Sequence, residues 1–171
     1  MKKILVILLA CVFVVTLSVA SFGLTSPALT RGHGVVTGML ETGQGQSSFI
    51  LGGEYAILKD FGVGLGISSN TTKIYAKYEL NPSVALTGGI YSVTGSSDPF
   101  LGINGGAAIN KDFMILGELD VVSTGGQFVF GYEAGAKFNI NKQFDIRGGV
   151  IGAFGNGSNS TQVELGVGFK F

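Results

Sequence analysis

Residues 161–171 read T-Q-V-E-L-G-V-G-F-K-F, and the spacing of their apolar side chains decides the fold. The apolar residues stand at every second position: Val163, Leu165, Val167, Phe169 and Phe171. Because a β-strand has a side-chain period of two, this stretch is predicted to be a strand with one apolar face and one polar or featureless face. Its length, about ten residues, is what a tilted strand needs to cross a bilayer.

The composition of the whole chain favours a protein that crosses a membrane with strands. Charged residues make up only 13% of the 171 residues, hydrophobic residues make up 46%, and there are 29 glycines. A soluble domain usually carries about 25% charged residues. After residue 20, no apolar run approaches the length of a membrane helix. Alternation explains both facts, because a membrane barrel places its apolar residues at every second position.

The first 20 residues are predicted to be a signal peptide that is cleaved after Ala20. Residues 1–3 carry two lysines, and an uncharged apolar run then continues to Val19. An uncleaved anchor helix is one alternative, because the run is close to the minimum spanning length of about 17 residues. Lipoprotein processing at Cys11 is another, although Cys11 lies inside the apolar run rather than at its end.

Charge and cysteine content exclude several classes of function. Cys11 is the only cysteine, so a chain cleaved after Ala20 would hold neither a disulfide nor thiol ligands for a metal. The formal net charge of the whole chain is zero, and loss of Lys2 and Lys3 with the signal peptide leaves the mature part slightly acidic. A nucleic-acid partner calls for a basic surface and is therefore not expected.

Residues 34–171 are predicted to form one antiparallel up-and-down transmembrane β-barrel of about ten strands, with eight as the alternative count. Residues 21–33, which include Pro27 and show no periodicity, are assigned to a linker. The predicted strands are residues 34–42, 48–58, 61–68, 72–80, 84–93, 100–109, 113–122, 127–140, 144–154 and 161–171. The barrel is expected to be closed, because lipid offers no water to satisfy an open strand edge.

The connections between the predicted strands alternate between two classes. One class consists of tight polar turns with Asn, Asp or Pro, at residues 58–61, 80–84, 109–113 and 140–144. The other class is rich in Gly, Ser, Thr and Asn, at residues 43–47, 69–71, 94–99, 123–126 and 155–160. Two alternating turn types are typical of a meander with two different ends, so we expect periplasmic turns at one end and outer loops at the other.

The ending G-F-K-F on an alternating strand resembles the closing strand of bacterial outer-membrane β-barrels, and the mature chain resembles the small barrels of the OmpA- and OmpX-like class. The resemblance implies that Val167, Phe169 and Phe171 form a signal read by the barrel-assembly machinery. It also implies a location in the bacterial outer membrane, with outer-membrane lipid as the surroundings. The chain departs from the class in having no Trp and only short predicted outer loops.

Most charged residues within the predicted strands fall on the polar faces, which are predicted to line the lumen. A Lys or Arg at mid-bilayer on the lipid face costs roughly 2–4 kcal/mol, which explains their absence there. The predicted lumen-facing charges are Glu54, Lys77, Glu79, Glu118, Asp120, Glu133, Lys137, Arg147 and Glu164. The excess of acids would favour cations in a narrow pore. The alternative is a plugged interior in which these groups pair, because a ten-strand barrel is little wider than the eight-strand size that side chains fill.

The function predicted from these features is a structural protein or a low-conductance, porin-like passive channel, and not an enzyme. His33, the only histidine, lies in the linker and suggests no catalytic triad. Glu118 and Asp120 are candidates for a paired-carboxylate site, although a ladder of lumenal charges is the favoured interpretation. No cofactor or metal is expected. The alternatives are a soluble exported β-barrel or sandwich that carries an apolar ligand and, third, an outer-membrane enzyme.

Overall fold

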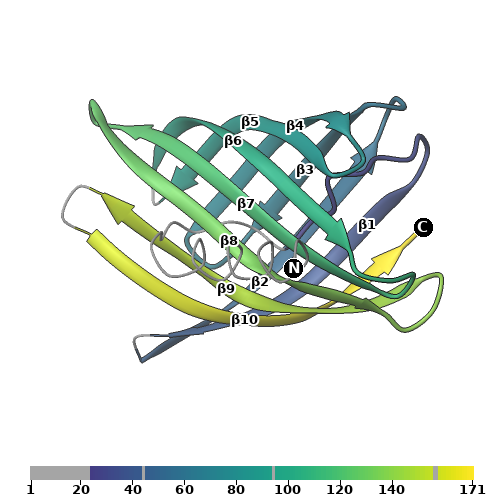
Figure 1. The fold of residues 1–171 in the computed structure, drawn as a ribbon. Helices are drawn as coiled ribbons and strands as arrows, with labels where there is room; N and C mark the ends of the chain where they lie inside the picture. The colour runs from purple at the N-terminus through teal and green to yellow at the C-terminus, as the bar shows by residue number, and fades with distance from the viewer. Residues whose placement is uncertain (1–23, 44, 94, 156–157) are drawn as a thin grey trace, which may run out of the picture.

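The computed structural model describes residues 24–171 except 44, 94, 156 and 157. These residues form a closed antiparallel barrel in which each of ten strands pairs with its neighbours in sequence and β1 closes on β10 (Figure 1). No helix among them is long and apolar enough to cross a membrane. The strands are β1 Gly34–Gly43, β2 Gln46–Ala56, β3 Phe61–Ile67, β4 Thr71–Asn81, β5 Val84–Val93, β6 Ser96–Ala108, β7 Phe113–Thr124, β8 Gln127–Asn139, β9 Phe144–Gly155 and β10 Ser158–Lys170. The predicted up-and-down barrel is confirmed, and the strand count is ten rather than eight.

The two ends of the barrel have different connections, but the lengths differ from the prediction. At the end where β1 begins and β10 ends, which we call the terminal mouth, Asn side chains organise the turns. The Asn110 and Asn141 carboxamide oxygens each accept two backbone N–H bonds of 2.8–2.9 Å. At the far end, four of the five connections contain only two residues. Residues 94–99 and 155–160, predicted as loops, lie mostly in β6, β9 and β10, because glycines such as Gly95, with φ of 91°, allow tighter turns.

The outer face of the barrel is apolar. Leu101 is 73% exposed, and Phe128 and Leu165 are each 62% exposed. The buried face carries most of the charged side chains of the strands. Apolar residues therefore face outward and charged residues inward, which is the reverse of a soluble carrier. The alternative of a soluble barrel with an apolar interior is wrong for this chain.

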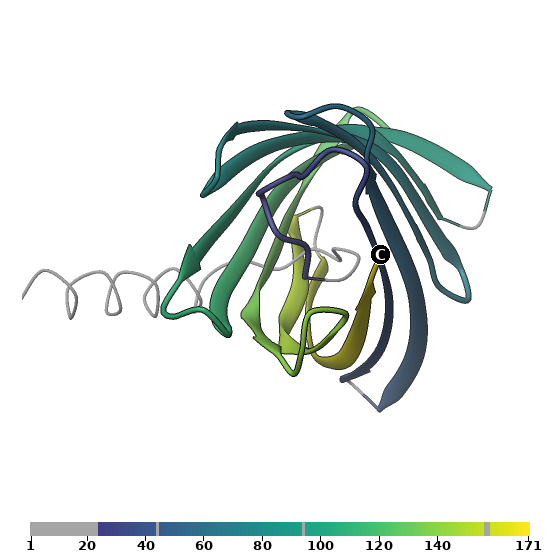
Figure 2. The same cartoon turned by 90° about the vertical axis from the view of Figure 1, so that its right-hand side faces the viewer.

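The segment between the predicted signal peptide and β1 is not a simple linker. Residues 24–30, which we call the plug segment, run inside the barrel at the terminal mouth, as the view into that mouth shows (Figure 2). Leu24 is 1% exposed, and Pro27 is also fully buried. This segment shows no apolar periodicity because it forms no regular element. The predicted cleavage site at Ala20 lies outside the described residues.

Candidate functional site

The interior of the barrel is the candidate site, and it contains the charges that the alternation assigned to it. Glu54, Lys77, Glu118, Asp120, Glu133, Arg147 and Glu164 are buried there, and Glu79 and Lys137 are half-buried. Glu41 and Asp145 are buried on the same face. These side chains come from seven of the ten strands, and the closed barrel brings them around one lumen.

Lys73 is a charged interior residue that was not predicted from the sequence. Its side chain is almost fully buried, and its Nζ lies 2.9 Å from Glu118 Oε1 and 2.7 Å from Asp120 Oδ2. The ammonium also stands 4.6 Å from the centre of the Phe100 ring, a cation–π distance. The signal for Lys73 was present, because it shares the inward parity of Tyr75 and Lys77 on β4.

The contacts of Lys73 change the interpretation of the two carboxylates. Glu118 accepts a further hydrogen bond of 3.3 Å from the Thr87 hydroxyl. Both Glu118 and Asp120 are therefore held by a buried cation in a compact cluster, which we call the Lys73 cluster. Carboxylates held in this way serve as fixed counter-charges in the barrel wall rather than as an open acid–base pair.

A second buried ion pair lies nearer the terminal mouth. Lys77 Nζ is 2.5 Å from Glu54 Oε2, and the Tyr75 hydroxyl donates to the same oxygen at 3.0 Å. The Lys77 ammonium also donates to Thr25 Oγ1 at 2.7 Å and to the Ser26 carbonyl oxygen at 3.2 Å. Lys77 thus joins the wall of the barrel to the plug segment.

Three further wall residues hold the plug segment. Arg147 Nη1 donates to the Leu24 carbonyl oxygen at 2.5 Å. Asn104 Nδ2 donates to the Thr25 carbonyl oxygen at 3.2 Å, and Glu79 Oε2 accepts the Leu29 N–H at 2.5 Å. These contacts satisfy backbone groups that have no strand partner, which is the condition for burying an irregular segment.

Glycines on the inner wall leave room for the plug segment. A Cβ atom at Gly106 would lie 2.8 Å from Pro27 Cδ, and one at Gly135 would lie 2.6 Å from Leu24 Cδ1. Such distances are too short for a side chain, so the plug segment packs directly against the backbone of β6 and β8. Part of the terminal half of the lumen is therefore occupied by the chain itself.

Apolar and aromatic side chains fill part of the far half of the lumen. Tyr75, Phe100 and Val122 form one buried cluster, and Met39 and Ile50 form another. Tyr91 packs against both clusters. The lumen is thus not lined by charges alone.

Acidic side chains also face one another across strands in the middle of the barrel. Glu41 on β1 is directly opposite Glu164 on β10, and Glu118 on β7 is opposite Glu133 on β8. Neither carboxylate oxygen of Glu164 has a hydrogen-bond partner among the described residues, although the residue is only 1% exposed. This arrangement places several acidic side chains close together in the middle of the lumen.

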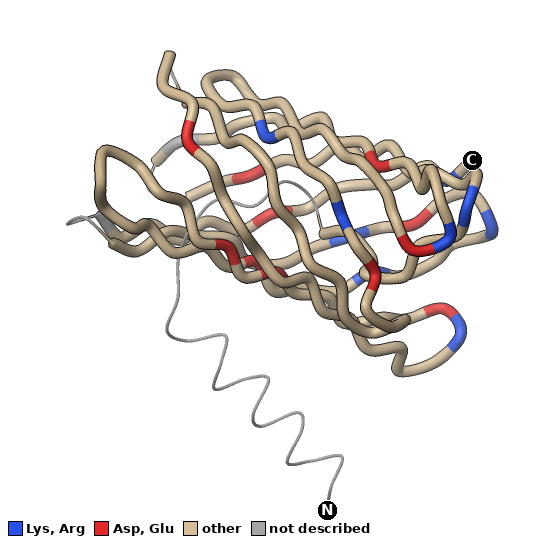
Figure 3. The backbone as a smooth tube through the Cα atoms, turned by 90° about the horizontal axis from the view of Figure 1, so that it is seen from above, with Lys and Arg blue, Asp and Glu red and all other residues tan. Residues whose placement is uncertain are grey.

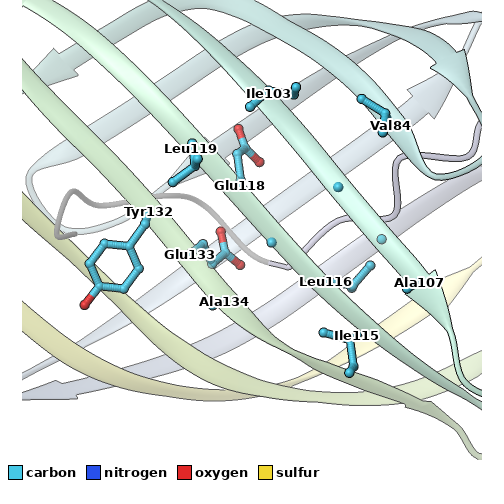
Figure 4. Close-up of a pocket in the computed structure, with 13 residues that line it drawn as sticks. Val84, Ile103, Ala107, Ile115, Leu116, Glu118, Leu119, Tyr132, Glu133 and Ala134 are labelled. Atoms are coloured by element: carbon cyan, nitrogen blue, oxygen red, sulfur yellow. The ribbon is translucent and has the colours of Figure 1, made fainter. Parts of the chain in front are cut away.

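The wall around Glu118 and Glu133 contains a hollow of about 420 Å³ between β5 and β8 (Figure 4). Ile103, Ile115 and Leu119, which line it, belong to the exposed apolar outer face. The lining thus combines outward apolar residues with the buried Glu118 and Glu133. Among the described residues, no group of His, Cys, Asp and Glu side chains has an arrangement that would hold a metal ion.

Comparison with solved structures places this geometry among known barrels. The chain is similar to the KdgM porin, with 13% identity and a TM-score of 0.54, over 80% of this chain and 99% of that one. It is also similar to the NanC porin, with 10% identity and a TM-score of 0.51, over 81% of this chain and 100% of that one. The fold is that of a porin-like barrel. No protein-family model and no curated protein matches the sequence.

The porin-like fold and the apolar outer face together point to the bacterial outer membrane. At these identities the similarity describes the fold alone. What the lumen does must follow from the residues of this chain, in which charged pairs and the plug segment occupy the lumen.

Proposed function

We propose that this protein is a porin-like, passive outer-membrane barrel of low conductance, whose lumen is closed in the described state by the plug segment. The observation that carries the proposal is the set of hydrogen bonds from Lys77, Asn104 and Arg147 to residues 24–26. An irregular segment held by a few polar contacts is easier to displace than a strand of the barrel. Its displacement would leave a narrow, charge-lined path.

The proposed orientation places the terminal mouth in the periplasm and the far end outside. Because the ten strands put the start of β1 and the end of β10 at one mouth, both lie on the periplasmic side in this orientation. The far-end connections are short, so they offer little surface to a partner outside the cell. The proposed role therefore depends on the lumen and the wall of the barrel and not on long outer loops.

A passive role is favoured over catalysis by the contacts of the carboxylates. Glu118 and Asp120 share the Lys73 ammonium, and Glu54 binds Lys77. A general acid or base needs a site for substrate beside it. In this barrel, Lys73 and Lys77 occupy the positions beside the carboxylates that a substrate would need.

The function is tested by the conductance of the mature barrel in a planar bilayer, beside a variant that lacks residues 24–30. We expect rare, small steps from the wild type and steps several-fold larger from the deletion variant. A Lys59→Ala variant, altered in an exposed turn, is the matched control and should behave as the wild type. If a deletion variant that is shown to be inserted gives no conductance steps, the conducting function is contradicted. A purely structural role would then remain.

We also propose that Val167, Phe169 and Phe171 form the assembly signal of the OmpA- and OmpX-like class. Their side chains lie on the outer face, with exposures of 56%, 39% and 54%. The Phe171 N–H donates to the Gly34 carbonyl oxygen at 3.0 Å, and its ring stacks with Tyr55. The residues therefore sit on the seam that closes the barrel.

Phe171→Ala should lower the amount of folded barrel in cells while leaving refolding into lipid vesicles, without the assembly machinery, largely intact. Phe138→Ala, which alters a similarly exposed outer Phe in β8, is the control and should affect neither. Equal folded yields of Phe171→Ala and wild type in cells would contradict the signal.

Amino-terminal sequencing of the exported protein tests the proposed cleavage after Ala20, which predicts a chain that starts at Ser21.

A further inference from the structure

The terminal mouth contains a pocket with an unusual charge. It has a volume of about 300 Å³ and lies between the segment that leads into β1 and the inner wall of the barrel. Its lining includes four cationic side chains, Lys137, Lys142, Arg147 and Lys170, and one carboxylate, Glu54. This volume is at the lower end of the range, about 300–1,000 Å³, for pockets that bind small molecules.

The acids near the pocket are already engaged by other cations. Glu54 accepts from Lys77 and Tyr75. Asp145, which lies behind the pocket, accepts from Arg147 Nε at 2.6 Å and lies 3.5 Å from Lys170 Nζ. The direct ion pairs of these two acids are thus with Lys77, Arg147 and Lys170.

Among the described residues, Lys137 and Lys142 have no carboxylate in direct contact. No acidic side chain among the described residues lies within 4.0 Å of either ammonium, whereas Arg147 and Lys170 have such a partner. Lys137 is moreover directly opposite Arg147 in the β8–β9 pairing. Like charges at directly opposed positions destabilise a sheet. An anion bound between them would remove that repulsion.

The distribution of charge over the whole barrel strengthens the field at this mouth. In the described residues, Lys73 is the only Lys or Arg that lies nearer the far end of its strand. Figure 3 shows the other basic residues toward the end that holds the C-terminus. A cleft lined by one sign of charge focuses the field and concentrates ions of the opposite sign.

We propose that the pocket at the terminal mouth binds a small solute through a carboxylate or phosphate group, held by Lys137 and Lys142 with Arg147 and Lys170 beside them. The middle of the lumen offers such an anion the acidic side chains Glu133 and Glu164 rather than cations. The barrel therefore retains an anion at the mouth and does not favour its passage. The site is formed with the plug segment in place, because residues 26 and 28–30 line it, so binding is tested on the closed barrel and does not depend on conductance.

Binding is tested by isothermal titration calorimetry on the whole mature barrel in a zwitterionic detergent. Citrate and inorganic phosphate are the probes, and chloride keeps the ionic strength constant. We expect saturable binding of at least one probe. Comparison of the two affinities tells whether the site prefers a carboxylate or a phosphate group. The affinity should fall at least about tenfold in Lys137→Met and in Lys142→Met, because each removes a charged hydrogen-bond donor to the anion.

Two matched controls separate a built pocket from general attraction. Lys59→Met and Lys111→Met remove exposed turn lysines near the same mouth that do not line the pocket, and they should bind as the wild type does. Lys137→Arg should retain binding. If Lys137→Met does not fold, Lys142→Met decides, because Lys142 is exposed in a turn. Absence of saturable binding, or equal losses in pocket and control variants, would overturn the site.

Discussion

The two halves of the lumen are filled in different ways. In the terminal half, a segment of irregular chain lies against glycines and is held through its backbone by Lys77, Asn104 and Arg147. In the far half, side chains of the wall itself fill the space, with the Lys73 cluster beside Tyr75 and Phe100. Under the proposed function the first kind of filling is displaceable, because it depends on the position of one segment. The second is part of the barrel wall and can be removed only by substitution.

The charges follow the same division. The far half and the middle hold more acids than bases, and the terminal mouth collects the bases. A buried charge is stable only when it is paired and hydrogen-bonded. The far half therefore depends on one cation, Lys73, whereas the terminal half distributes its pairing over several residues. This difference predicts a graded response to removing single charges.

Lys73→Met should have the largest effect. It leaves Glu118 and Asp120 buried without their cation, which costs about 3–5 kcal/mol of unfolding free energy. The measurement is a urea titration of the barrel refolded into lipid vesicles. A triple variant, K73M/E118Q/D120N, should recover much of the lost unfolding free energy, because it also removes the two unpaired carboxylates. A stability of Lys73→Met equal to that of the wild type would show that the Lys73 cluster does not support the far half.

Gly106→Ala should act on the terminal half alone. Its new methyl group would meet Pro27 at 2.8 Å and Leu116 at 3.1 Å, so the plug segment must shift, at a cost of about 1–3 kcal/mol. Gly105→Ala is the matched control, because the nearest atoms to its Cβ lie 3.9 Å away. We expect trypsin to cleave after Arg31 several-fold faster in Gly106→Ala only. Equal cleavage rates in the two variants would contradict tight packing of the plug segment.

Glu164→Gln should have a smaller effect, of opposite sign. The carboxylate has no donor among the described residues and faces Glu41, so the neutral amide removes repulsion and supplies a donor. We expect a gain of about 1 kcal/mol in the same urea titration. Glu54→Gln is the comparison, because Glu54 is paired with Lys77 and should lose stability instead. A loss in both variants would show that Glu164 is stabilised by its surroundings after all.

Lys170→Met should have the smallest effect. Its ammonium lies 3.5 Å from Asp145 and its side chain is 29% exposed, so water competes for the pair. The expected loss in urea titration is below about 1 kcal/mol. The contrast with Lys73→Met tests whether position in the barrel, rather than the presence of an ion pair, sets the contribution. Losses of similar size in the two variants would remove that contrast.

The sequence predicted the wall of the barrel well because the wall depends on local spacing. The alternation in β10 identifies both its outward Leu165 and its inward Glu164 without knowledge of the partner strands. The same rule would have identified Lys73, whose parity on β4 is that of Lys77. The strand boundaries at the far end of the barrel were less predictable. Glycines such as Gly95 permit turns that are shorter than the polar stretches of the sequence there suggest.

The contents of the lumen could not be predicted in the same way. The plug segment has no period, and its bond from Leu24 to Arg147 joins residues 123 positions apart in the chain. Whether Glu118 and Asp120 face a substrate or a lysine depends on which strands the closed barrel brings opposite them. The pocket at the terminal mouth likewise needs residues from both ends of the chain, such as His33 and Lys170. The spacing of residues within one strand does not show which residues from distant parts of the chain will lie beside them.

Thiol labelling gives the most direct measurement of the plug segment. Removal of the predicted signal peptide takes away Cys11, the only cysteine, so a single introduced cysteine reports on its own position. Thr25 is 5% exposed, whereas Thr30 is exposed at the mouth. In the reconstituted barrel, a membrane-impermeant thiol reagent should modify Thr30→Cys rapidly and Thr25→Cys many-fold more slowly. Equally rapid modification at both positions would show that residues 24–30 are a solvated linker and that the lumen is not closed by them.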